Sequence, residues 1–184
     1  MEGLEFYDVV KIAAGSGVVA AGLNQVFQLI KDRKKRTQEA KYCAVHLIGK
    51  LERFALSCAD QTYWHERILA QGNNENTCSL PDMTWLEDTL DPLDSEISSQ
   101  VAWIDTETSL AYGRVRVNME NDCDLDGEAT DCITVVGYIG YRAADLADQI
   151  RARYKLPSLV SEWSLKDHKT HLAMYRDRAK KHLG

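Results

Sequence analysis

Proline is scarce in this sequence and absent from its first 80 residues. The chain has 184 residues and only three prolines, Pro81, Pro92 and Pro157. Proline lacks a backbone N–H and breaks the interior of a helix, so nothing in the first 80 residues forces a helix to end. The sequence therefore favours long helices, and we expect a mostly all-α fold.

Cysteines are few and lack the spacing of a structural site. There are five, with no C-x-x-C pair. An odd number argues against a disulfide framework, and the missing pair argues against zinc. The cysteines fit a reduced, cytoplasmic domain in which they serve mostly as small apolar residues.

Recognisable catalytic motifs are also missing. The sequence contains no nucleophile elbow, no phosphate-binding loop, no G-x-G-x-x-G fingerprint and no H-E-x-x-H zinc motif. We therefore expect a protein that is not an enzyme and has no resident cofactor.

The most informative stretch that is present is an apolar run over residues 9–30. A helix of these 22 residues is about 33 Å long, enough to cross a bilayer core of about 30 Å. Asn24, Gln25 and Gln28 are its polar exceptions. The run predicts a single transmembrane helix; a buried soluble helix and a helix lying in the membrane interface are the alternatives.

Charge on either side of the run sets the expected orientation. Residues 1–10 contain no base, whereas five of the six residues 31–36 are basic. By the positive-inside rule, residues 1–8 form a short extracytoplasmic N-terminus and the rest lies in the cytoplasm. The predicted location is the inner (cytoplasmic) membrane.

The remaining residues divide into a basic stalk over 31–71 and a cytoplasmic helical domain over 72–184. Residues 72–131 carry 15 acids and two bases. This acidic middle would repel phosphates, so a nucleic-acid partner is disfavoured. We expect the basic flanks to fold back on the acidic segment.

Apolar spacing predicts where the helices bury their faces. A 4-3-4-3-4 stripe runs from Ala40 to Cys58, and a 4-3-4-3-4-4 stripe that favours a long helix runs from Cys132 to Tyr154. The first is interpreted as a face that packs on the domain. Asp91-Pro92 resembles a helix start. Residues 112–138 also contain alternating β-branched segments, so a small β-hairpin there is an alternative to helix.

Two weak metal motifs occur in the second half. Asp122, Asp124 and Asp126 precede Gly127, as in the first half of a calcium loop, but the twelfth position is Ile133 instead of the required Glu. We interpret them as a solvated acidic loop, with Ca²⁺ or Mg²⁺ binding as the alternative. His168 and His171 share a helix face without a third ligand, which indicates a surface helix.

Small residues predict self-association of the apolar run. Ala13, Gly17 and Ala21 are spaced four apart, and such spacing lets helix backbones approach closely in lipid. The stripe below offers a second seam. We expect a homo-oligomer that uses both; the stripe residues assigned to it are Ala44, Leu47, Leu51 and Phe54.

An anchor, a basic stop and a helical part together resemble the layout of many small bacterial proteins, including accessory proteins of phage and phage-defence loci. The likeness covers architecture only. The first functional hypothesis is a membrane-anchored, non-catalytic scaffold for a cytoplasmic protein partner. The second is an oligomeric membrane-perturbing effector, in which Asn24, Gln25 and Gln28 face a polar lumen. The third is a soluble helical binding module or enzyme.

Overall fold

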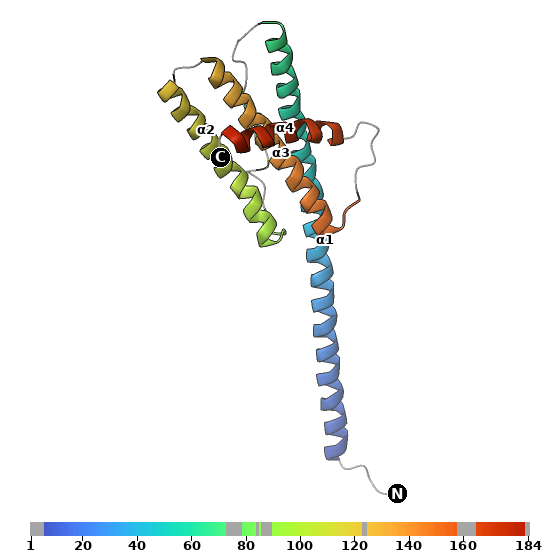
Figure 1. The fold of residues 1–184 in the computed structure, drawn as a ribbon. Helices are drawn as coiled ribbons and strands as arrows, with labels where there is room; N and C mark the ends of the chain where they lie inside the picture. The colour runs from blue at the N-terminus through green and yellow to red at the C-terminus, as the bar shows by residue number, and fades with distance from the viewer. Residues whose placement is uncertain are drawn as a thin grey trace. The chain divides into compact units, whose positions relative to one another are not determined.

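The structure is a computed structural model, and the residues that it describes form four helices. It describes the backbone of residues 6–72, 79–83, 85, 90–122, 125–157 and 165–182, and the side chains of these ranges except 6–20, 118–129 and 182. The helices are α1 (Phe6–Ala70), α2 (Ser95–Asp122), α3 (Leu125–Tyr154) and α4 (Leu165–His182) (Figure 1). The described backbone contains no strand. The predicted all-α class is therefore confirmed.

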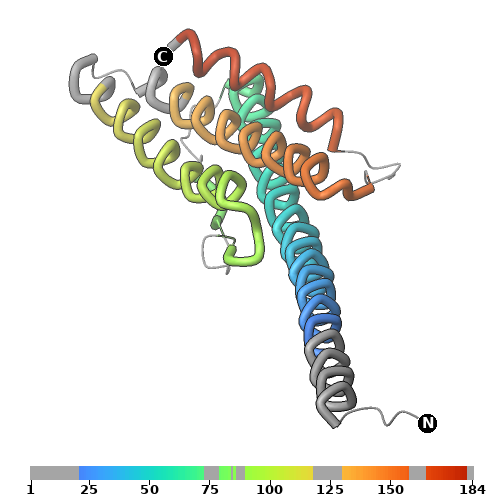
Figure 2. Tube along the Cα trace, turned by 90° about the horizontal axis from the view of Figure 1, so that it is seen from below, coloured from blue at the N-terminus to red at the C-terminus, as the bar shows by residue number. Residues whose placement is uncertain are grey.

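The chain divides into two compact units, residues 1–40 and residues 41–184. Helix α1 contributes to both, because it continues unbroken through the boundary as the missing prolines predict. In the first unit, every described side chain from residue 21 to residue 39 is exposed. In the second unit, α3 packs against both α2 and α4 and lies between them (Figure 2).

The predicted stripe of α1 lies in the core of the second unit. Its members Ala44, Leu47, Leu51, Phe54 and Cys58 are all less than 5 % exposed. They share one buried cluster with the apolar faces of α2, α3 and α4. The interpretation that this face packs on the chain's own domain is confirmed.

Two glycines of α3 allow its neighbours to come close. A Cβ at Gly140 would lie 2.5 Å from the Cβ of Cys58 in α1, and one at Gly137 would lie 2.5 Å from the Cβ of Tyr175 in α4. Real side chains do not tolerate such distances, so only glycine fits at these crossings. Close packing of α1 and α4 on α3 depends on both residues.

Residues 112–122 and 125–138 are helical, so the alternative of a β-hairpin at 112–138 is wrong for the described residues. In α2, Val115 is buried whereas Val117 is exposed, although a strand would place both on one face. The apolar stripe with a helical period outweighs the local preference of valine and isoleucine for strands.

The start of α2 lies later than Asp91-Pro92. Leu93 donates its N–H to the Leu90 carbonyl at 2.9 Å, so the dipeptide forms a turn. Asp94 caps the helix by accepting a 3.1 Å hydrogen bond from the N–H of Ile97. This bond lowers the pKa of the Asp94 carboxyl. The predicted helix start at Asp91-Pro92 is therefore wrong: α2 begins at Ser95, and Asp94 is its cap.

Candidate functional site

The first candidate site is the exposed stretch of α1 over residues 21–39. Its large apolar side chains are 48–66 % exposed, although such residues normally avoid water. They are Leu23, Val26, Phe27, Leu29 and Ile30. The predicted polar residues Asn24, Gln25 and Gln28 are exposed on the same stretch, as is Ala21.

At 100° per residue, these side chains separate into two arcs. The five apolar residues lie on one side of the helix axis and the three amides on the other. Ala21 falls on the arc of the amides, because the step from Ala21 to Asn24 is three residues and that from Asn24 to Gln28 is four. The stretch therefore has one apolar face and one face of small and amide side chains.

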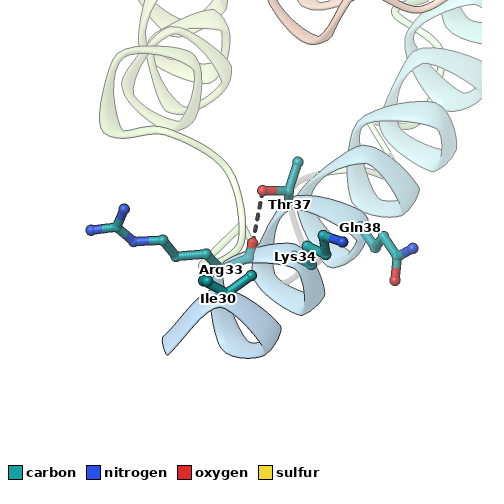
Figure 3. A pocket seen from close by; sticks show the side chains of 5 residues that line it. All are labelled: Ile30, Arg33, Lys34, Thr37 and Gln38. Carbon is teal, nitrogen blue, oxygen red and sulfur yellow. Dashed lines mark hydrogen bonds between the residues drawn. The ribbon is translucent and has the colours of Figure 1, made fainter. Parts of the chain in front are cut away.

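A shallow depression of about 350 Å³ lies where the apolar stretch meets the basic block, lined by Ile30, Arg33, Lys34, Thr37 and Gln38 (Figure 3). The Thr37 hydroxyl donates a 2.8 Å hydrogen bond to the Arg33 carbonyl, so its proton is not available to a ligand. The lining pairs one apolar side chain with two cations. It suits an amphiphilic anion better than an apolar molecule.

The predicted span over residues 9–30 is described only in part, because the side chains of residues 9–20 lie outside the described residues. Among the described residues, no helix reaches the length and hydropathy that a membrane crossing needs. Ala13 and Gly17 also lie outside the described side chains. The membrane anchor and its small-residue seam therefore remain predictions.

The second candidate site is a polar cluster buried between the end of α1 and α4. Thr62 and His65 of α1 and His171 of α4 are all less than 8 % exposed. Thr62 Oγ1 and His171 Nε2 are 2.9 Å apart. The Thr62 hydroxyl also donates its proton to the Ala59 carbonyl at 2.7 Å, so His171 Nε2 must be the donor in the bond to Thr62.

Aromatic rings close the cluster. Tyr63 stacks on His171 with ring centroids 3.9 Å apart and an angle of 15° between the planes. The Tyr175 hydroxyl donates a 2.8 Å hydrogen bond to Glu66 Oε1. His168 meets the Tyr63 ring edge-on at 5.9 Å. These contacts fix α4 on the last turns of α1.

Two histidines in this cluster favour the neutral form. Burial lowers the pKa of His65, and the nearby Arg178 charge lowers it further while Glu66 opposes both. Burial likewise lowers the pKa of His171. Both ring nitrogens of His65 find no hydrogen-bond partner among the described residues. The cluster is therefore sensitive to protonation.

The remaining predicted site residues fall elsewhere. The side chains of Asp122, Asp124 and Asp126 lie outside the described residues, while the backbone is helical again from Leu125 and Ile133 is buried in the core. No group of three or more metal-binding side chains occurs in the described part of the chain. His168 and His171 share a face, but that face packs on α1, which corrects the interpretation of a surface helix for His171.

Sequence reasoning found the two histidines of α4 and missed their partners in α1. A signal existed, because Thr62 and His65 continue the 4-3 spacing of the stripe that ends at Cys58. Polar residues at core positions of a stripe mark a buried polar contact.

Comparison with known proteins adds no functional assignment: no family model, curated protein or solved structure matches this chain significantly.

Proposed function

We propose that this chain is a non-catalytic interaction protein, anchored in a membrane by residues 9–30, that presents its helical unit to a protein partner in the cytoplasm. The exposure of five large apolar side chains in residues 21–30 carries the proposal. Soluble monomers rarely leave so contiguous an apolar surface uncovered. A bilayer would cover it.

The basic block supports a membrane over other covers. Lys31, Arg33, Lys34, Lys35 and Arg36 directly follow the apolar stretch and are all exposed. Cations at this position attract anionic headgroups, at about 1 kcal/mol per residue near the surface. They also favour a cytoplasmic location for the rest of the chain.

The two arcs of residues 21–30 support self-association within the membrane. The apolar arc suits lipid, whereas Ala21, Asn24 and Gln28 form a face where small residues permit contact and amides hydrogen-bond between helices. Gly17 extends this face by the same spacing. The stripe seam at Ala44, Leu47, Leu51 and Phe54 is occupied by the chain's own core, so its role in an oligomer would require the second unit to open.

Carbonate extraction tests the anchor. The full-length chain should stay with the membrane pellet at high pH. Changing Val26 and Phe27 to Asp should move it to the supernatant, because two charges in the apolar stretch cost about 2.5–3.5 kcal/mol each. The matched control places Asp at Tyr42 and Val45, which are equally exposed but outside the predicted span. Native protein in the supernatant without detergent would refute the anchor.

Cysteine labelling in intact bacterial cells tests the orientation. A Glu2→Cys variant should react with a membrane-impermeant maleimide before lysis, whereas the five native cysteines should react only after lysis and unfolding, since Cys58 is buried. Labelling of the native cysteines in intact cells would reverse the proposed topology. The partner itself is best sought by co-purification, with accessory proteins of phage and phage-defence loci as the first context.

The shared face of Asn24 and Gln28 also favours a second function, a membrane-perturbing oligomer. In such an assembly the amides would line a polar lumen instead of bonding between helices. Reconstituted protein would then release a trapped dye from phosphatidylglycerol-containing vesicles. Changing Asn24, Gln25 and Gln28 to Leu should abolish that leakage but leave membrane binding intact. Vesicles that stay sealed at micromolar protein would exclude this function.

A further inference from the structure

Helix α2 carries an apolar strip on its outer face. Trp103, Leu110 and Val117 follow one another at intervals of seven residues and are 55–63 % exposed. Thr106 and Gly113 lie between them and are also exposed. The inward face of α2, from Ile97 through Val101 and Ile104 to Val115, lies on the opposite side of the helix and packs into the core.

The strip is not covered by the described chain. In both views α2 lies at the outside of the second unit beside α3, and its other side faces no described helix (Figures 1 and 2). A spacing of seven places these three side chains in one row along the helix, the direction along which a second helix packs. The cover it fits is therefore a helix.

We infer that this strip binds a second copy of α2 in antiparallel orientation, with the two-fold axis near Leu110. The inference extends the self-association of the proposed function to the second unit, and it needs neither the anchor nor the small residues of the span. Three features of α2 make the strip complementary to itself.

The first feature is size. An antiparallel pair centred on Leu110 places Trp103 of one copy against Val117 and near Gly113 of the other copy. The two-fold symmetry repeats this contact at the other end of the strip. A Cβ at Gly113 would meet nothing within 4 Å, so space for a large ring exists there. Large side chains opposite small ones pack well, whereas a parallel pair would set Trp103 against itself.

The second feature is charge. Glu107 and Arg114 lie on one edge of the strip, three residues before and four residues after Leu110. Antiparallel pairing brings Glu107 of each copy beside Arg114 of the other. Arg142 of α3 donates a 3.0 Å hydrogen bond to Glu107 Oε2, which holds that carboxylate at the edge. A parallel pair would separate Glu107 from Arg114 by about two turns of helix.

The third feature is placement on a rigid support. Helix α2 is anchored along its inner face, and the Thr108 hydroxyl bonds back to the Ile104 carbonyl at 2.7 Å without using the outer face. The strip is thus preformed, and little conformational entropy is lost when a second copy binds.

Mass measurement of the full-length chain in mild detergent tests the strip. We expect a particle of twice 20.8 kDa after correction for detergent. Leu110→Glu should weaken association about tenfold or more, because it buries a carboxylate at the centre of the contact. The matched control is Met174→Glu, an equally exposed apolar residue of α4 away from the strip. Equal association of both variants, together with no cross-linked dimer of Leu110→Cys, would overturn the inference.

Oxidative cross-linking tests the contact at single residues, so it works even when the membrane span also holds two copies together. Leu110→Cys should give a cross-linked dimer that the native chain, with its own five cysteines, does not give. Val117→Cys should not, because antiparallel pairing separates the two copies of residue 117 by about 21 Å along the axis. Efficient cross-linking at 117, or none at 110, would refute the antiparallel strip while leaving the membrane extraction result untouched.

Discussion

Helix α1 contains two stretches with the same backbone and opposite surroundings. Residues 21–39 expose every side chain, whereas residues 41–70 bury one face in the core of the second unit. Both stretches carry apolar residues at helical spacing. Spacing therefore specifies a helix and its face, but what covers that face depends on the rest of the chain.

The two stretches of the 65-residue helix α1 also differ in what stabilises them. Tertiary packing stabilises most helices in proteins more than residue propensity does. Residues 41–70 receive that packing from α3 and α4. Residues 21–39 receive none from the described side chains. In the proposed function a bilayer supplies it to residues 21–30.

Truncation of one leucine in each stretch gives the largest contrast. Leu51→Ala should lower the free energy of unfolding of the helical unit by about 2–5 kcal/mol, because the side chain is fully buried and leaves a cavity. Leu23→Ala should change it by less than about 0.5 kcal/mol. Urea titration in mild detergent, followed by tryptophan fluorescence, measures both. Equal losses would mean that residues 21–30 belong to the same core.

Glycine replacements sharpen the contrast within the second unit. Gly140→Ala should cost about 1–3 kcal/mol, since the added Cβ would collide with Cys58 in α1. Gly113→Ala should instead stabilise α2 by about 0.5–1 kcal/mol, because its Cβ meets nothing and alanine favours helix. Thermal unfolding of the two variants should shift in opposite directions. Loss of stability in both would show that Gly113 has a role beyond the described packing.

Of the two stretches of α1, only residues 41–70 take part in the buried histidine cluster of the described chain, through His65 and through the contact of Thr62 with His171 of α4. The pKa of His65 and that of His171 are lowered from 6.5 in the folded state, so the unfolded chain binds protons more readily. Their contribution to stability is full above about pH 6.5 and is lost as the pH falls below it. Glu66, His168 and Arg178 are the charged neighbours that modulate this loss.

The measurement is the unfolding midpoint between pH 8 and pH 5. It should fall with pH in the native chain, and the fall should be smaller when His65 and His171 are both changed to Gln. His46→Gln, at an exposed position of the same helix, is the control and should behave like the native chain. The lowered pKa of Asp94 adds losses only below its ordinary value of 3.8, outside this window. A native midpoint independent of pH would contradict the buried cluster.

The contrast between the two stretches also shows which parts of the fold and of the candidate site can be predicted from the sequence. The absence of early prolines and the stripes at Ala40–Cys58 and Cys132–Tyr154 predict α1, α3 and their buried faces, because an apolar stripe at helical spacing is the dominant local signal. The Thr62–His171 contact was not predicted, since it joins residues 109 positions apart that only the crossing of α4 brings together. The outer strip of α2 was not predicted, because the alternation around Val115 and Val117 favours a strand as well as a helix.

Ion pairs give the smallest effect and the finest test of the two stretches. Arg151 Nη2 lies 2.5 Å from Glu52 Oε1, and both side chains are less than 15 % exposed. Lys35 and Glu39 are 3.8 Å apart, and each is more than half exposed. Water screens the second pair and competes for its charges, whereas the first pair is shielded and joins α1 to α3.

Glu52→Gln should therefore lower the free energy of unfolding by about 1 kcal/mol, since the amide keeps one hydrogen bond and loses the charge. Glu39→Gln should change it by less than about 0.5 kcal/mol. Raising the salt concentration should remove what small effect Glu39→Gln has, because exposed charges are screened within about 10 Å at 0.1 M salt, and should leave most of the effect of Glu52→Gln. A larger loss at Glu39 than at Glu52 would mean that the Lys35–Glu39 pair is covered by protein contacts and not exposed to water.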